Sequence, residues 1–134
     1  MFLDFISVGA STPNLVRIYG TDVRDYTRLS ESFHHLSAGS LEEISLKDDL
    51  SFTAEGSLDL IALSASYRAI EAKGDFITWR MLPEDWMVAA ELVLPFLRGV
   101  AVGTYQWLAG REAEHLYTRD PITILLSFSE SGTW

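Results

Sequence analysis

The sequence has no cysteine among its 134 residues. Disulfide bonds, catalytic thiolates and cysteine-ligated metal centres are therefore excluded. The lack of cysteine agrees with a reducing compartment, and we expect a cytoplasmic protein. Basic residues are also scarce, with ten Lys and Arg against nineteen Asp and Glu, so the formal net charge is −9. Nucleic acids and anionic membranes bind basic surfaces, and we expect neither as a partner.

No segment has the length and apolarity of a membrane span. Residues 86–108 come nearest, but Glu91 and Pro95 interrupt them. The apolar N-terminus contains Asp4 and no basic residue, so it does not resemble a signal peptide. We therefore expect one soluble domain over residues 1–134, and the hydrophobic fraction of 48% suffices for a packed core.

Hydrophobic periodicity predicts two units in which a strand leads almost directly into a helix. The first has a strand over residues 14–20 and a helix over residues 22–37. Asp22 and Gly39 are suited to cap the two ends of this helix. Its apolar stripe consists of Tyr26, Leu29, Phe33 and Leu36.

The second unit has a strand over residues 76–82 and a helix over residues 83–98. Pro83 is suited to the first helical position, where its missing N–H has no partner anyway. Pro95 removes a main-chain hydrogen bond, so we expect a kink or an early end of the helix there. Apolar residues occupy most sides of this helix, which predicts that more than one side is covered. They are Trp86, Met87, Ala89, Ala90, Val93, Leu94, Phe96 and Leu97.

The two units continue in the same way. A glycine ends each helix and two strands follow, so the chain has two halves of similar element order. The further strands are predicted over residues 2–8, 42–47, 58–67, 103–110 and 122–129. Each helix can cover sheet built from its own flanking strands. We therefore predict an α+β fold, in which two helices cover one face of a largely antiparallel mixed sheet of six to seven strands.

The chain resembles a group of small bacterial proteins that are usually called hypothetical. The resemblance lies in the segments VRIYGTDVRDYTRLSESFHHLSAG, FITWRMLPEDW, LVLPFLRG, GTYQWL and ITILLSFSESGTW. In that group a threonine precedes the proline of the second helix, whereas this chain has Leu82 and lacks that side-chain cap. The resemblance implies no activity or catalytic residues. In size, acidity and α+β pattern, the chain is also similar to immunity proteins of bacterial toxin systems.

The sequence contains no motif for catalysis, nucleotide binding or metal binding. His34 and His35 are adjacent on the predicted first helix and point about 100° apart, so they cannot hold one metal from the same face. With His115 they are the only histidines. The zinc spacing H-E-x-x-H, the nucleophile elbow and the glycine-rich phosphate loops are missing. We predict no cofactor, no metal and no enzymatic activity; an enzyme with a carboxylate or histidine in a pocket is the third hypothesis.

Acidic residues are concentrated between Glu31 and Asp59. This range has seven acids and one base, a net charge of −6, whereas the rest has twelve acids and nine bases, a net charge of −3. A solvated loop and strand face would account for the cluster, and a surface for a basic partner is the functional alternative. The acids that we predict to contact a partner are Glu42, Glu43, Asp48, Asp49, Glu55 and Asp59.

Tyr105 and Trp107 alternate on a predicted strand and therefore point to the same face. They belong to the core if helices cover that face, and to an interface if they do not. The leading hypothesis is a non-enzymatic, immunity-type inhibitor whose acidic surface neutralises a basic toxin domain, with aromatic anchors. The alternative is a structural domain that forms a homodimer through the open face of its sheet.

Overall fold

The structure is a computed structural model that describes residues 1–6, 14–54, 56–111 and 113–130. The first half of the chain contains β1 (Phe2–Ile6), β2 (Asn14–Gly20), α1 (Val23–Ala38), β3 (Glu43–Ser45), β4 (Thr53–Ala54) and β5 (Asp59–Ser64). The second half contains β6 (Ala69–Lys73), β7 (Phe76–Met81), α2 (Pro83–Val93), the 3-10 helix η1 (Leu94–Arg98), β8 (Tyr105–Ala109) and β9 (Ile122–Phe128).

The α+β class is confirmed, but the prediction of a single, largely antiparallel sheet is wrong. The strands form two mixed sheets. We call the five-stranded sheet, in the order β4-β1-β2-β9-β8, sheet A, and the four-stranded sheet, in the order β3-β5-β7-β6, sheet B. Each helix connects the two sheets: α1 leads from β2 of sheet A to β3 of sheet B, and α2 leads from β7 of sheet B to β8 of sheet A.

Apart from β4, the element order repeats as an antiparallel pair of strands, a helix and a second antiparallel pair. In the first half the antiparallel pair β1–β2 precedes α1, and the antiparallel pair β3–β5 follows it. In the second half β6–β7 precedes α2, and β8–β9 follows it. Each sheet joins one hairpin from each half through a parallel pair: β2 with β9 in sheet A, and β5 with β7 in sheet B.

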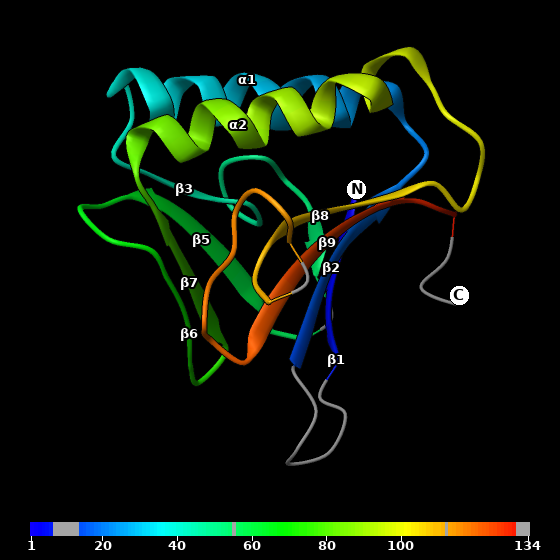
Figure 1. Ribbon diagram of the computed structural model, residues 1–134. Coiled ribbons are helices and arrows are strands. Elements are labelled where there is room, and N and C mark those ends of the chain that lie inside the picture. Colours follow the sequence, from blue (N-terminus) through cyan, green and yellow to red (C-terminus); the bar gives the residue numbers. More distant parts are fainter. Residues whose placement is uncertain (7–13, 55, 112, 131–134) are drawn as a thin grey trace.

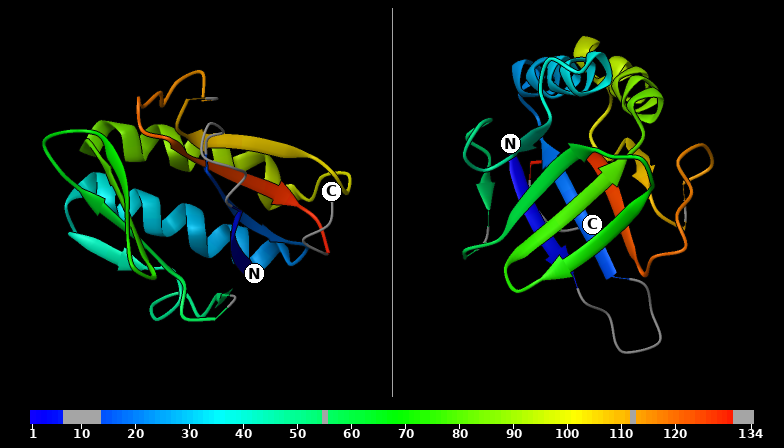
Figure 2. Two further views of the ribbon diagram at one scale, coloured as in Figure 1. Left: turned by 90° about the horizontal axis from the view of Figure 1, so that it is seen from below. Right: turned by 90° about the vertical axis from the view of Figure 1, so that its left-hand side faces the viewer.

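The two helices lie side by side as one layer, and the two sheets extend from this layer and face each other (Figures 1 and 2). The core lies between these three surfaces. At its centre the Trp79 and Trp86 rings are 4.7 Å apart, and Phe33 lies 5.5 and 5.2 Å from them. Because these rings come from β7, α2 and α1, the aromatic cluster joins both helices to sheet B.

The predicted ends of the first helix are confirmed. The Asp22 carboxylate accepts a hydrogen bond from the Arg24 N–H at 3.0 Å, and Gly39 has the left-handed conformation, with φ of 77°. The predicted apolar stripe of α1 is fully buried. An acceptor at the N-terminus and a glycine after the C-terminus satisfy the main-chain groups that a helix leaves unpaired.

The second helix begins at Pro83 and ends early, as Pro95 predicts. The α-helical part stops at Val93, and the tighter 3-10 turn of η1 follows. The expectation that this helix is covered on more than one side is wrong for Met87 and Leu94, which are exposed by 42% and 46%. Neither helix in the described ranges has the length and apolarity that a membrane crossing requires.

Candidate partner-binding surface

The acidic segment (residues 42–49) lies at the edge of sheet B. Glu42 and Glu43 are exposed where β3 begins, and Asp48 and Asp49 are exposed in the turn after it. Ser45 holds this turn in place. Its hydroxyl accepts a hydrogen bond from the Asp48 N–H at 3.0 Å, and its own N–H donates to the Asp49 carboxylate at 2.7 Å. The segment therefore presents its carboxylates from an ordered turn.

Asp59 is not a surface residue. It is buried, and it accepts hydrogen bonds from the Ser45 hydroxyl at 2.5 Å and from the Lys47 N–H at 3.1 Å. Its carboxylate fastens the acidic turn to β5, so it positions the turn and cannot itself contact a partner. Glu55, the other acid predicted beyond the turn, lies outside the described residues.

The four exposed acids of this segment lie close together in the chain and, among the described residues, are not neutralised by basic side chains. Within the described ranges, Glu42, Glu43, Asp48 and Asp49 form no ion pair. Five acids elsewhere are neutralised in the pairs Asp4–Arg17, Asp22–Arg24, Asp25–Arg28, Glu71–Arg80 and Asp85–Arg68. Other exposed acids that form no ion pair in the described part of the chain, such as Glu31 and Glu91, lie apart from one another in the sequence, whereas the acidic segment gathers four of them in one short stretch.

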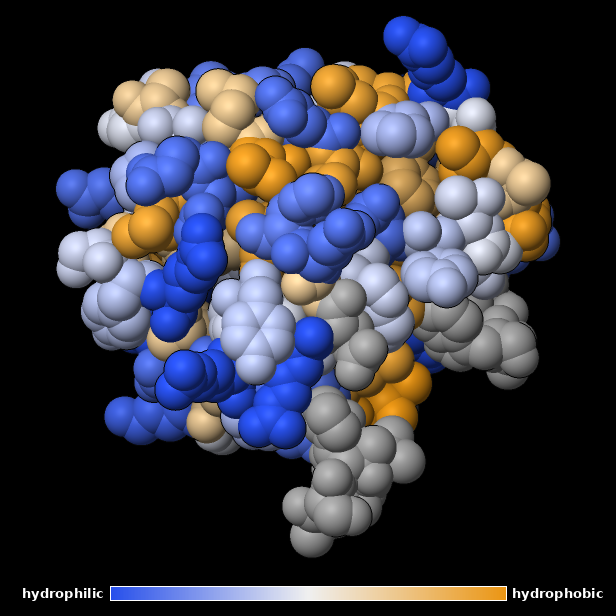
Figure 3. Space-filling view, viewed as in Figure 1, coloured by the Kyte–Doolittle hydropathy of each residue, from blue (hydrophilic) through white to orange (hydrophobic). Residues whose placement is uncertain are grey.

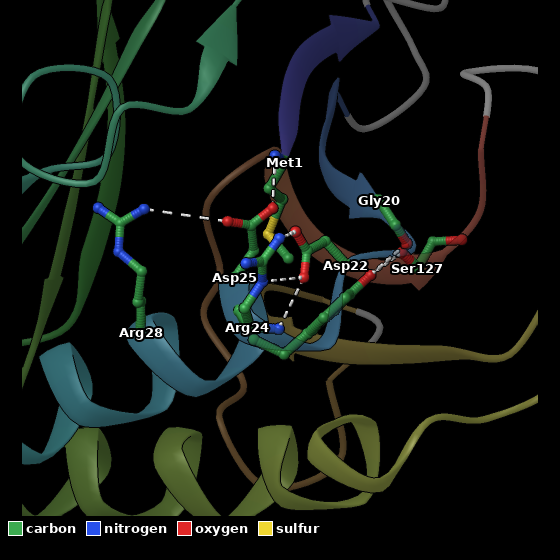
Figure 4. Close-up of polar contacts among 8 residues, drawn as sticks. Met1, Gly20, Asp22, Arg24, Asp25, Arg28 and Ser127 are labelled. Carbon is green, nitrogen blue, oxygen red and sulfur yellow. Dashed lines mark hydrogen bonds and ion pairs between the residues drawn. The ribbon is translucent and has the colours of Figure 1, made fainter.

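The start of α1 illustrates such neutralisation (Figure 4). The Asp25 carboxylate lies 2.8 Å from the Met1 amino group and 3.9 Å from the Arg28 guanidinium. Asp22 pairs with Arg24 at 3.0 Å, and this hydrogen bond holds the pKa of the Asp22 carboxyl below its ordinary value. Both acids also lie near the positive end of the helix dipole. They contribute little to the field outside the molecule.

A buried tyrosine joins the same helix end to sheet A. The Tyr26 hydroxyl lies 2.7 Å from the Gly20 carbonyl and 2.8 Å from the Ser127 carbonyl (Figure 4). Because the hydroxyl has one proton, it donates to one of these carbonyls at a time. Burial raises the pKa of this phenol. Tyr26 is therefore a structural residue that keeps its proton.

Tyr105 and Trp107 lie on the face of sheet A that points away from the helices. They are in register with Ser127 and Leu125, whereas the neighbouring Leu126 belongs to the core. Tyr105 is exposed by 55%, Trp107 is partly buried, and their rings are 6.1 Å apart. Trp107 nevertheless packs against the core, so Tyr105 is the more exposed member of the pair. Their contact with a partner stays a prediction.

The acidic segment and this aromatic pair are not neighbours. The turn after β3 leads into β4, at one edge of sheet A, while Tyr105 and Trp107 lie on β8 at the opposite edge. Four strand spacings separate the two edges, which is about 19 Å. Phe2 and Tyr19, whose rings stack at 5.3 Å, belong to the strands between them. The two predicted groups of contact residues therefore form two separate surfaces.

The histidines are dispersed. His34 and His35 are exposed in the last turns of α1, and His115 is exposed in the connection between β8 and β9. In the part of the chain that the structure describes, no group of three or more His, Asp or Glu could hold a metal ion. The described histidines thus show no joint site.

One exposed residue next to the acidic segment was missed by the sequence analysis. Leu41 is exposed by 42% and directly precedes Glu42. Its N–H donates to the His35 carbonyl, which holds it at the C-terminal end of α1. The only signal in the sequence was an isolated leucine between polar residues, outside either helix or strand pattern.

Comparisons with models of protein families, with curated proteins and with solved structures found no match.

Proposed function

We propose that this protein is a non-enzymatic inhibitor of the immunity type, which binds a basic protein domain through its acidic segment. The observation that carries the proposal is that four exposed carboxylates, which form no ion pair with the described residues, lie together in the acidic segment, held by an ordered turn. Unpaired surface charge of one sign steers a partner of the opposite sign and raises its association rate. A reducing cytoplasm suits a chain without cysteine, and it is where such an inhibitor would meet its toxin.

The acidic segment also has an exposed apolar neighbour and an ordered support. Leu41 offers an exposed apolar side chain beside Glu42 and Glu43. Apolar and aromatic anchors carry most of the energy of protein interfaces, while charges at the rim set rate and specificity. Ser45 and Asp59 fix the turn, so that little conformational entropy is lost when a partner binds.

A charge reversal tests this proposal. The probe is the protein encoded by the reading frame next to this one, if that frame encodes a toxin-bearing chain. Its association rate with the variant Glu42→Lys/Glu43→Lys/Asp48→Lys should fall at least about tenfold at low salt, and the dependence on salt should weaken. Asp49 is left unchanged because it bonds to the main chain of Ser45. An unchanged association rate would sink the proposal.

A structural domain that self-associates through the outer face of sheet A is the second candidate. It is favoured by the exposure of Phe2 (40%) and Tyr105 (55%) on that face. Sedimentation of the isolated protein separates the two candidates. A tight dimer that Tyr105→Glu dissociates supports the second; a monomer that binds the neighbouring gene product supports the first.

A further inference from the structure

The outward side of the second helix differs from that of the first. Both helices lie in one layer, and each has a side that points away from the sheets (Figure 1). Apart from Ala38 at its end, the exposed residues of α1 are charged or polar: Arg24, Arg28, Glu31, His34 and His35. On α2 and η1, Met87 and Leu94 are exposed instead. Figure 3 shows apolar side chains gathered on the surface at the level of α2. The position of the helix layer does not account for this difference.

The exposed residues of this side follow a regular spacing. We call Glu84, Met87, Glu91, Leu94 and Arg98 the α2 outer face; all five are exposed. The intervals of three, four, three and four residues are those of a seam along which one helix packs on another. Beside this seam, residues of η1 line a groove of about 660 Å³, which also includes Glu91, Leu94 and Arg98. The groove places Arg98 on the same side as Glu91 and Leu94, although η1 is wound more tightly than α2.

We infer that a second copy of this chain docks on the α2 outer face, with the two α2 helices antiparallel about a two-fold axis. The charges of the face select this orientation. Glu84 lies at one end and Arg98 at the other, and within the described ranges neither forms an ion pair with another residue. In an antiparallel arrangement each Glu84 faces the Arg98 of the other copy, whereas a parallel arrangement places like charges together.

The apolar residues fit the same register. When Glu84 faces Arg98, Met87 of each copy lies close to Leu94 of the other and beside the groove of η1. Methionine adapts its shape to such a groove. Glu91 is at the midpoint between positions 84 and 98, so the two Glu91 carboxylates approach each other at the axis and weaken the dimer. The contact involves one helix from each copy and is smaller than a standard interface of about 800 Å² per partner, so the dimer is weak.

This inference does not depend on the proposed function. In Figure 2, β3 lies on the α1 side of the helix layer, away from α2. A dimer through α2 therefore leaves the acidic segment of each copy accessible. It also differs from the second candidate function, in which the sheets and not the helices form the contact.

Sedimentation equilibrium of the full chain, measured up to about 1 mM, tests the inference. We expect a reversible monomer–dimer equilibrium whose association constant falls at least about tenfold in Leu94→Glu. Glu84→Arg and Arg98→Glu should each lower it about fivefold, and the double variant should restore it because the ion pairs form again with opposite polarity. Glu91→Gln should raise it. Tyr105→Glu, on the outer face of sheet A, is the matched control and should leave it unchanged.

Three results would overturn the inference. The first is a single monomeric species at about 1 mM. The second is a dimer that Tyr105→Glu dissociates and Leu94→Glu does not. The third is an association constant of the double charge variant that is no higher than that of the single variants. This would contradict the antiparallel register. Thermal unfolding of each variant shows whether it is folded; where Leu94→Glu does not fold, Met87→Ser replaces it.

Discussion

Asp85 and Arg68 form a bidentate ion pair, in which the two carboxylate oxygens accept hydrogen bonds from the guanidinium group, each at 2.7 Å. Asp85 is buried, and it also accepts a hydrogen bond from the Leu82 N–H at 3.1 Å. Leu82 has no side-chain acceptor with which to cap α2. The carboxylate of Asp85 therefore supplies part of the cap at the N-terminus of α2. It also links this helix to Arg68, which directly precedes β6. The hydrogen bond from Arg68 to Asp85 raises the pKa of the guanidinium.

Replacement of Asp85 by asparagine should lower the free energy of unfolding by about 2 kcal/mol. The loss is smaller than for a fully buried ion pair, because solvent screens the partly exposed Arg68 side chain. The change leaves a guanidinium without its counter-ion and removes a charge that suits the helix dipole. Urea denaturation measures the effect. Asp22→Asn is the matched control, since asparagine also caps helices well and that carboxylate is exposed. Equal effects at both positions would contradict the structural role of the buried pair.

Alkaline conditions should destabilise the fold through Tyr26. Its pKa is raised by burial, so the folded state keeps the phenol proton at a pH where the unfolded state has lost it. The stabilisation is complete below about pH 10, the ordinary pKa of tyrosine, and is lost as the pH rises above it. This group contributes a slope of about −1.4 kcal/mol per pH unit in that range.

Denaturation between about pH 9 and 11.5 measures that slope in the wild type and in Tyr26→Phe. The variant should lack the contribution, although it is less stable at neutral pH because the Gly20 and Ser127 carbonyls lose a donor. Absorbance at the phenolate wavelength should show that one of the five tyrosines keeps its proton until the protein unfolds. Ionisation of all five in the folded state would refute the assignment.

Gly110 should not tolerate a side chain. It has φ of 113°, and a Cβ there would lie 2.6 Å from the Cα of Thr123 in β9. We expect Gly110→Ala to cost about 3 kcal/mol, because a strained backbone and a steric overlap add. Gly39→Ala is the control, since Gly39 also has positive φ but nothing lies within 4 Å of its Cβ position. It should cost about 1 kcal/mol.

Neutralising the acidic segment should not destabilise the protein. In Glu42→Gln/Glu43→Gln/Asp48→Asn the free energy of unfolding should stay within about 0.5 kcal/mol of the wild type or rise, because mutual repulsion among these acids is relieved. Urea denaturation at low salt measures it. Asp59→Asn is the contrasting variant and should destabilise the turn, since it weakens the bonds from Ser45 and Lys47. A large loss of stability in the triple variant would show that these acids serve the fold.

Local signals in the sequence were sufficient for both helices and for most strands, but not for β4. The strand over residues 14–20 has the predicted bounds, and the helices begin and end within a residue or two of Asp22, Gly39 and Pro83. The break at Pro95 also follows from local chemistry, because proline has no N–H to donate. The predictions for these elements depend only on residues close together in the chain, so they do not require the fold to be known.

The sequence by itself determined the two strand–helix units, their caps and the concentration of acids between Glu31 and Asp59. Only the tertiary structure decided that β2 pairs with β9 and β5 with β7, which divides the strands into two sheets. It likewise decided that Asp59 is buried while Asp48 is exposed, and that Met87 faces outward. The physical reason is that hydrophobic periodicity shows which side of a helix or strand faces the core, but it does not show which strand pairs with which. That choice depends on contacts between residues as distant as Asn14 and Ile122.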